Sequence, residues 1–152
     1  NIEDCRYISE DDYDSIIEAR KLQKNDVLLT MDGGTSIGKP VLFNLDGSYT
    51  VDSHIPILRN PKISEKAWVY LLASPIGQLQ FNRAESGASG QTSVTEEDLR
   101  RFRFPTKLLA QIDALAKELD LERKKINLER CELDKREHEA WEQFSLKCLC
   151  NS

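Results

Sequence analysis

The C-terminal stretch restricts the fold most, because residues 106–147 contain neither Gly nor Pro. Apolar residues recur there at alternating steps of four and three, which places them on one side of a helix. The apolar residues of this stripe are Leu108, Ile112, Leu115, Leu119, Ile126 and Leu133. Glu122 and Glu129 occupy the two other positions of the same repeat. It predicts a single helix of about 40 residues and about 60 Å, at 1.5 Å per residue.

A helix of that length cannot bury its stripe against a preceding domain of about 100 residues. We therefore expect a partner helix, either from a second copy of the chain in a homodimer or from the remainder of a longer protein. Other large apolar residues lie beside the stripe and indicate a packing surface wider than a two-stranded coil: Leu121, Leu128, Trp141 and Phe144.

Short strand and helix signals alternate in residues 1–104. Apolar runs at 27–29 and 41–43 flank a Gly-rich turn and predict paired strands. Further strands are expected at 49–51 and 54–58, and the alternation of Arg and Phe predicts another at 100–104. Helix-start residues that can cap the first turn are Ser9, Ser64, Ser74 and Thr95. The sequence thus predicts an α+β fold: a twisted or barrel-like sheet with short helices in residues 1–104, then one long coiled-coil helix in residues 105–152.

The turn between the first two strands resembles a phosphate-binding loop. Residues 33–39 have the spacing Gly, four residues, Gly, Lys, which matches the first seven positions of that motif. The eighth position is Pro40, which lacks the hydroxyl that would hold magnesium, and strand-like residues follow where a helix should open. A nucleotide-using enzyme is therefore the least favoured of three functional hypotheses.

Cysteine and histidine usage gives no catalytic or metal-binding pattern. Neither zinc-site spacing nor a disulfide framework is present among Cys5, Cys131, Cys148 and Cys150. His54 and His138 lie far apart, without the spacing of a catalytic triad. We therefore expect no catalytic residue, no metal and no cofactor, and a reducing, cytoplasmic setting. No apolar run approaches the roughly 20 residues of a membrane span, so no membrane partner is expected.

The distribution of charge along the chain is more informative than the net charge. The net charge of −5 argues against a nucleic-acid partner, because phosphate binding depends on Lys and Arg. However, residues 1–18 hold seven acids and one Arg, whereas residues 19–104 hold eleven Lys and Arg against nine acids. The central segment is therefore mildly basic, which is compatible with a local nucleic-acid-binding patch.

Several segments, in order, resemble the specificity subunits of type I restriction-modification systems. Residues 25–39, NDVLLTMDGGTSIGK, resemble the family's GD-initiated strand and G-x-IGK turn, and residues 53–62, SHIPILRNPK, are similar to its next strand. Residues 67–81, AWVYLLASPIGQLQF, look like its helix pair, and residues 86–105, SGASGQTSVTEEDLRRFRFP, look like the segment before its long helix. The match covers residues 5–119. A full subunit has two recognition domains and two long helices, so the resemblance implies a half-subunit or a fragment.

The resemblance implies a non-catalytic module that recognises one half of a split target in double-stranded DNA. Its long helix would pair with that of a second specificity half and dock a DNA methyltransferase subunit. Lys and Arg would position phosphates while amide and hydroxyl side chains read base edges. By chemistry and position, the DNA-binding candidates are Thr35, Ser36, Lys39, Arg59, Lys62, Arg83, Ser89, Gln91 and Thr92.

The second hypothesis is a protein-interaction module whose function is coiled-coil dimerisation through the long helix. It would explain the acidic balance of the chain without a DNA partner.

Overall fold

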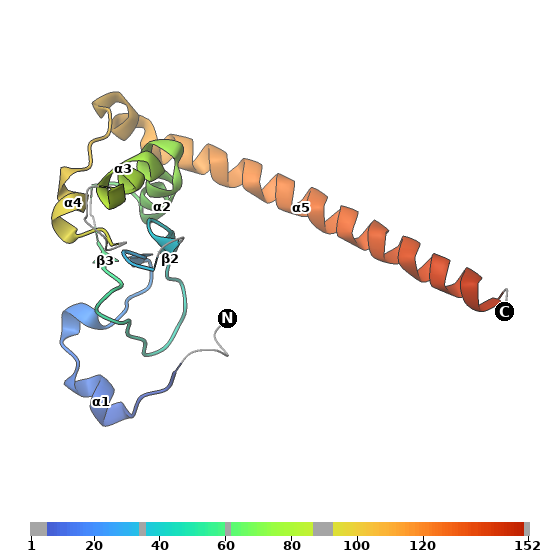
Figure 1. Cartoon of the computed structure of the whole chain (residues 1–152), viewed down its shortest axis with the longest axis horizontal. Coiled ribbons are helices and arrows are strands. Elements are labelled where there is room, and N and C mark those ends of the chain that lie inside the picture. Colours follow the sequence, from blue (N-terminus) through green and yellow to red (C-terminus); the bar gives the residue numbers. More distant parts are fainter. Residues whose placement is uncertain (1–5, 34–35, 60–61, 87–92, 151–152) are drawn as a thin grey trace. The chain divides into compact units, whose positions relative to one another are not determined.

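The computed structural model describes residues 6–33, 36–59, 62–86 and 93–150 (Figure 1). The chain divides into two compact units, residues 1–113 and 114–152. The sequence-based boundary after residue 104 falls earlier, because the first two turns of the long C-terminal helix belong to the first unit. Among the described residues, no helix has both the length and the apolarity needed to cross a membrane.

A small antiparallel sheet forms the centre of the first unit. It contains β1 (Val27–Leu29), β2 (Pro40–Leu42) and β3 (Ile57–Leu58), in the order β2-β1-β3. Val27 lies opposite Leu42 on one side and Leu58 on the other. The expected pairing of the two apolar runs is therefore confirmed, and Pro40 occupies an edge strand, where a missing N–H is tolerated. Residues 49–51 were expected to form a strand but contribute an isolated bridge between Lys21 and Thr50.

Side-chain caps begin the short helices. These helices are α1 (Glu10–Ser15), α2 (Glu65–Ala73), α3 (Pro75–Ser86) and α4 (Glu96–Arg101), with the 3-10 helix η2 at Glu18–Arg20. The hydroxyls of Ser9, Ser64 and Thr95 each accept from the amide three residues later. Such bonds satisfy a donor that the helix itself leaves unpaired. The sequence-based helix starts are therefore confirmed, together with the α+β class.

The strand expected at residues 100–104 is not formed. Helix α4 continues to Arg101, because the Thr95–Asp98 capping box begins it and the pairs Arg100–Glu96 and Arg101–Glu97 stabilise it. The backbone turns extended at Phe102, and the rings of Phe102 and Phe104 both pack half-buried against the core. The alternation of Arg and Phe thus reflects one-sided packing rather than strand pairing.

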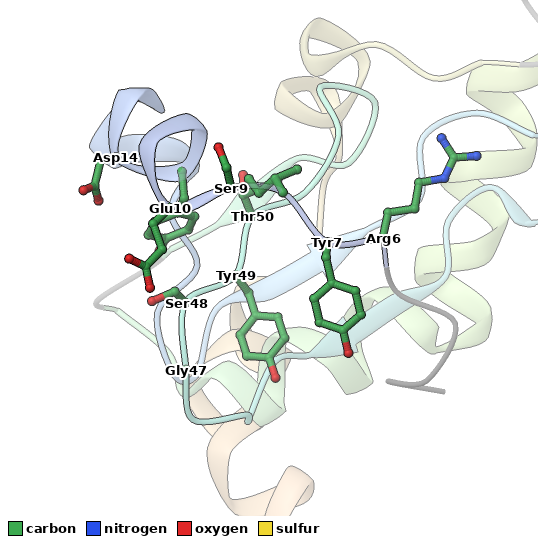
Figure 2. Close-up of a pocket in the computed structure, with 11 residues that line it drawn as sticks. Arg6, Tyr7, Ser9, Glu10, Asp14, Gly47, Ser48, Tyr49 and Thr50 are labelled. Carbon is green, nitrogen blue, oxygen red and sulfur yellow. The ribbon is translucent and has the colours of Figure 1, made fainter.

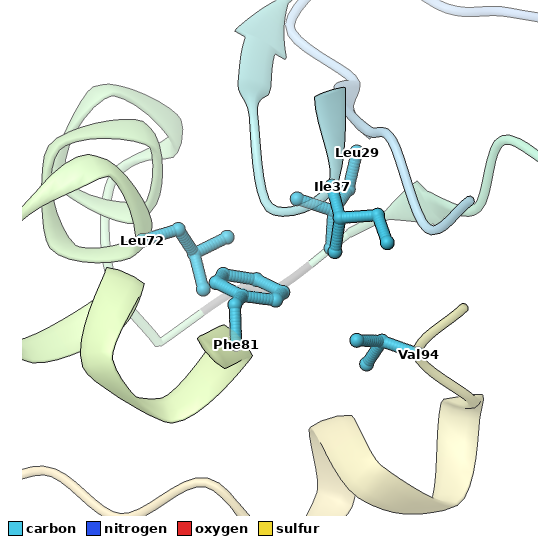
Figure 3. Packing of buried hydrophobic residues seen from close by; sticks show 5 residues of the cluster. All are labelled: Leu29, Ile37, Leu72, Phe81 and Val94. Carbon is cyan, nitrogen blue, oxygen red and sulfur yellow. The ribbon is translucent and has the colours of Figure 1, made fainter. Parts of the chain in front are cut away.

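The core joins the sheet to the helices. Its buried cluster contains Leu29, Ile37, Leu72, Phe81 and Val94, whose side chains converge in Figure 3. Each comes from a different element or turn: β1, the β1–β2 turn, α2, α3 and the segment before α4. A three-stranded sheet this short needs such packing to be stable.

The β1–β2 turn lies directly on α3. Gly38 has a positive φ of 76°, and a Cβ added there would lie 2.7 Å from the ring of Phe81. From α3, the amide of Gln78 donates to the carbonyl of Gly38 at 2.7 Å and to that of Leu72 at 2.9 Å. The turn is therefore fixed by both ring packing and a side-chain hydrogen bond.

The C-terminal helix α5 spans Thr106–Cys150. Its 45 residues correspond to about 68 Å at 1.5 Å per residue. The prediction of one continuous long helix is therefore confirmed.

We expect Gly38→Ala to lower the free energy of unfolding by about 2–3 kcal/mol, because the new methyl group meets the Phe81 ring and the positive φ is strained. The matched control is Gly33→Ala, since Gly33 also has a positive φ, of 93°, but no atom within 4 Å of an added Cβ. This control should cost only about 1 kcal/mol, from backbone strain alone. Urea denaturation would measure both, and equal losses would contradict the role of the Phe81 contact.

Candidate nucleic-acid interface and helix-pairing surface

The β1–β2 turn presents two of the DNA-binding candidates, Ser36 and Lys39. Lys39 is exposed and Ser36 is half-buried. The backbone beneath them is ordered, because Gly38 N–H donates to the Thr30 carbonyl at 2.9 Å and Thr30 N–H donates to the Lys39 carbonyl at 3.3 Å. The main chain of Gly38 and Lys39 is thus held by hydrogen bonds, and the Lys39 ammonium group beside it is exposed.

Arg83 lies on the element that supports this turn. It is exposed in the last turn of α3. Residues 82–86 have the polar composition that is typical of a loop, but they continue the helix to its end at Ser86. Because Gln78 and Phe81 of α3 contact Gly38, Lys39 and Arg83 belong to elements packed against each other. Among the described residues, neither side chain has an acidic partner within salt-bridge distance.

Apart from Arg59, five further DNA-binding candidates remain. Lys62 is exposed just before α2 and makes an interaction within the chain. Four candidates lie outside the described residues: Thr35, Ser89, Gln91 and Thr92.

Arg59 has a structural role. Its Nε lies 2.6 Å from Oδ1 of Asp26 and its Nη2 lies 2.7 Å from Oδ2, a bidentate pair with a carboxylate that is almost fully buried. The same guanidinium donates to the Lys21 carbonyl at 3.0 Å. Hydrogen bonding to Asp26 raises the pKa of Arg59. We therefore do not carry this residue into the proposed DNA-contacting set.

The sheet also separates Arg59 from the turn. Asp26 precedes β1 and Arg59 follows β3, at the end where Val27 pairs with Leu58. Lys39 precedes β2, at the other end, where Leu29 pairs with Pro40. Three strand residues, about 10 Å, lie between these two ends. The structure thus brings Ser36, Lys39 and the helix of Arg83 together and places Arg59 apart from them.

A polar hollow beside the first unit's sheet was not anticipated. It has a volume of about 470 Å³ and includes Asp32, His54, Ser53 and Ser93 among its lining residues. His54 Nδ1 lies 3.0 Å from Asp32 Oδ2, although 22 residues separate the two in sequence. No local spacing rule predicts a contact of this kind. The backbone N–H of His54 and then the Ser53 hydroxyl hold the pKa of Asp52 below its usual value.

Ser53 and His54 of this hollow do not form a pair of nucleophile and base. The Ser53 hydroxyl donates to Asp52 at 3.2 Å and not to the imidazole, so it lacks the contact between nucleophile and base. Within residues 6–33, 36–59, 62–86 and 93–148, no group of three His, Cys, Asp or Glu side chains is placed to hold a metal ion. The His54–Asp32 pair instead links the loop before β3 to the segment that follows β1.

The predicted helix-pairing residues fall into two groups. Leu108 is half-buried and Ile112 is buried within the first unit. In the second unit Ile126 is 40 % exposed and Leu133 is 58 % exposed, and Leu115 and Leu119 are similarly uncovered. Single exposed apolar residues are ordinary, but a row of them along one helix marks an interaction surface.

The row of exposed apolar residues extends beyond Leu133 when it is followed at the period of an α-helix. Phe144 lies 18 residues after Ile126, which is five full turns at 3.6 residues per turn and therefore the same side. Its ring packs edge-on against Trp141, with centroids 5.9 Å apart. Both aromatic side chains are exposed. The heptad count had placed Phe144 beside the stripe because it assumes 3.5 residues per turn.

No protein-family model matches the chain, and no curated protein matches it. Function must therefore be inferred from the residues and their arrangement.

We expect Arg59→Ala to reduce the free energy of unfolding by about 3 kcal/mol, because it leaves the buried Asp26 carboxylate without its cation. Arg83→Ala is the matched control: it removes an exposed Arg from the same unit and should change stability by less than about 0.5 kcal/mol. Chemical denaturation of both variants provides the measurement. Equal stability of the two variants would show that Arg59 is dispensable to the fold.

Proposed function

We propose that this chain is a non-catalytic, sequence-specific DNA-binding module of a restriction-modification system, acting in the cytoplasm on one half of a bipartite target. The main supporting observation is that the segments resembling the specificity subunits all contribute to one core. Residues 25–39 supply Leu29 and Ile37, and residues 67–81 supply Leu72 and Phe81. Leu58 and Val94 come from the other two segments. Short resemblances that pack together support a common origin more strongly than each does alone.

In this proposal the β1–β2 turn and α3 face the DNA backbone. Lys39 and Arg83 are exposed on these two contacting elements, so their charges are available to neutralise phosphates. Such contacts fix the register of the protein, and hydroxyl or amide side chains nearby would read base edges. Ser36 is the described candidate for that second role. Enzymatic activity forms no part of the proposal.

The long helix supplies the assembly function. Its exposed stripe would pair with the helix of a second specificity half and dock a DNA methyltransferase subunit. Two recognition units held by paired helices would then read the two halves of a split target.

Charge reversal at the proposed contacts tests DNA binding. A preferred duplex is first selected from a random pool, with the cognate methyltransferase subunit present where one is known. Lys39→Glu and Arg83→Glu should each weaken binding of that duplex about tenfold, and should each lower the salt dependence by about one counterion. Fluorescence anisotropy at several salt concentrations measures both quantities.

The control for that experiment is Lys24→Glu. Lys24 is exposed, pairs with Asp46 at 2.9 Å, and precedes β1 at the end of the sheet away from Lys39. Lys24→Glu changes the net charge by the same amount as Lys39→Glu or Arg83→Glu, and it should leave the affinity for DNA nearly unchanged. Wild-type affinity in both Lys39→Glu and Arg83→Glu would remove this face from the interface.

The second candidate function is a protein-interaction module without DNA binding. The exposed stripe of α5 favours it, as does the net charge of −5. The two functions differ in one respect, because only the first requires retention of duplex DNA.

Ile126→Asp should weaken self-association by roughly 100-fold or more, because it places a carboxylate in the apolar seam. Asn127→Asp is the matched control: it adds the same side chain one position along, about 100° around the helix. Sedimentation equilibrium of the full chain gives the dissociation constants. Equal association of the two variants would exclude the stripe as the dimer seam, whereas self-association without any DNA binding would favour the second function.

A further inference from the structure

A hollow lies at the N-terminal side of the first unit. It has a volume of about 730 Å³ and is formed by residues 6–14 on one side and residues 47–50 on the other (Figure 2). Three tyrosines line it, namely Tyr7, Tyr13 and Tyr49. A hollow with so much aromatic surface can hold a planar or cationic group.

The two tyrosines labelled in Figure 2 differ in how they are held. Tyr49 is fixed, because its ring packs edge-on against Phe43 with centroids 5.4 Å apart and lies close to Gly47. Tyr7 is 89 % exposed, so its ring gains almost nothing from folding. The ring of Tyr49 is held by packing and the ring of Tyr7 is exposed, so a ligand group can enter between the two rings.

The charge around this hollow is negative. Glu10 and Asp14 of α1 line it, and Asp11 and Asp12 continue the row of carboxylates on the same helix. Arg6 is the basic residue in the lining, and its guanidinium is directed away from the tyrosine rings in Figure 2. Phosphate groups would be repelled from such a surface, whereas ammonium and guanidinium groups would be attracted.

One cation already uses this aromatic surface. The Nζ of Lys21 lies 5.2 Å from the centroid of the Tyr13 ring, within the range of a cation–π contact. Glu18 lies 3.6 Å from the same ammonium group. An aromatic ring and a carboxylate therefore already hold one ammonium group beside the hollow.

We propose that this hollow is a docking site for a basic segment of a partner protein. A Lys or Arg side chain of that segment enters between Tyr7 and Tyr49, and Glu10 and Asp14 neutralise its charge. Asp11 and Asp12 of the same helix lie outside the lining of the hollow, so a chain segment with further basic side chains can reach them whereas a single small cation cannot. The site is independent of the proposed DNA contacts, which depend on Lys39 and Arg83.

The experiment uses the full chain and a fluorescent, amidated hexalysine peptide at moderate salt. Saturable binding is expected by anisotropy, with about fivefold weaker affinity in Tyr7→Ala and near wild-type affinity in Tyr7→Phe. Because Tyr7 is exposed, thermal unfolding should be unchanged in both variants. Asp14→Asn should weaken binding severalfold, whereas the matched control Glu97→Gln, which removes an exposed acid from α4, should not.

Three kinds of result would overturn the proposal. The first is the absence of saturable hexalysine binding. The second is equal binding by Tyr7→Ala and wild type, or equal losses in Asp14→Asn and Glu97→Gln, since either shows general charge attraction. The third is binding of tetramethylammonium as tight as that of the peptide, since it identifies a small-cation site in place of a protein-docking site.

Discussion

The contact between Gly38 and Phe81 is the constraint on which the first unit depends. Strands of two or three residues have too few ladder hydrogen bonds to persist alone, so they must be packed against helices. Phe81 is almost completely buried, and burying such a ring contributes about 1.5–3 kcal/mol. Only a residue without a side chain allows the turn to lie on that ring. The same contact joins the proposed DNA-facing turn to its supporting helix.

Helix caps, the first two paired strands and the long helix were the features that the sequence predicted well. Ser64 and Thr95 begin helices because a hydroxyl three residues before an amide is a short-range arrangement. Strand β2 begins at Pro40, directly after the turn residues Gly38 and Lys39. Residues 106–147 contain no Gly or Pro and form one helix. Long-range contacts could not be predicted in this way. The Arg59–Asp26 pair joins residues 33 apart, and it gives Arg59 a structural role that no short-range pattern indicates.

The distribution of charge reconciles an acidic protein with a proposed DNA partner. The carboxylates of α1 surround an aromatic hollow, whereas Lys39 and Arg83 lie on the β1–β2 turn and α3. Within the first unit, an acidic and a basic surface can therefore attract different partners, because exposed charges act mainly within a Debye length of about 10 Å. The net charge alone would have excluded one of these partners.

Arg20 illustrates how a loop can be anchored without restricting its side chains. Its guanidinium donates to the carbonyls of Val51 at 2.7 Å and Ile55 at 3.2 Å, and also to that of Asp52. Every acceptor is a main-chain oxygen, which any amino acid would supply in the same backbone conformation. The side chains at positions 51, 52 and 55 could therefore diversify during evolution while Arg20 keeps the loop in position.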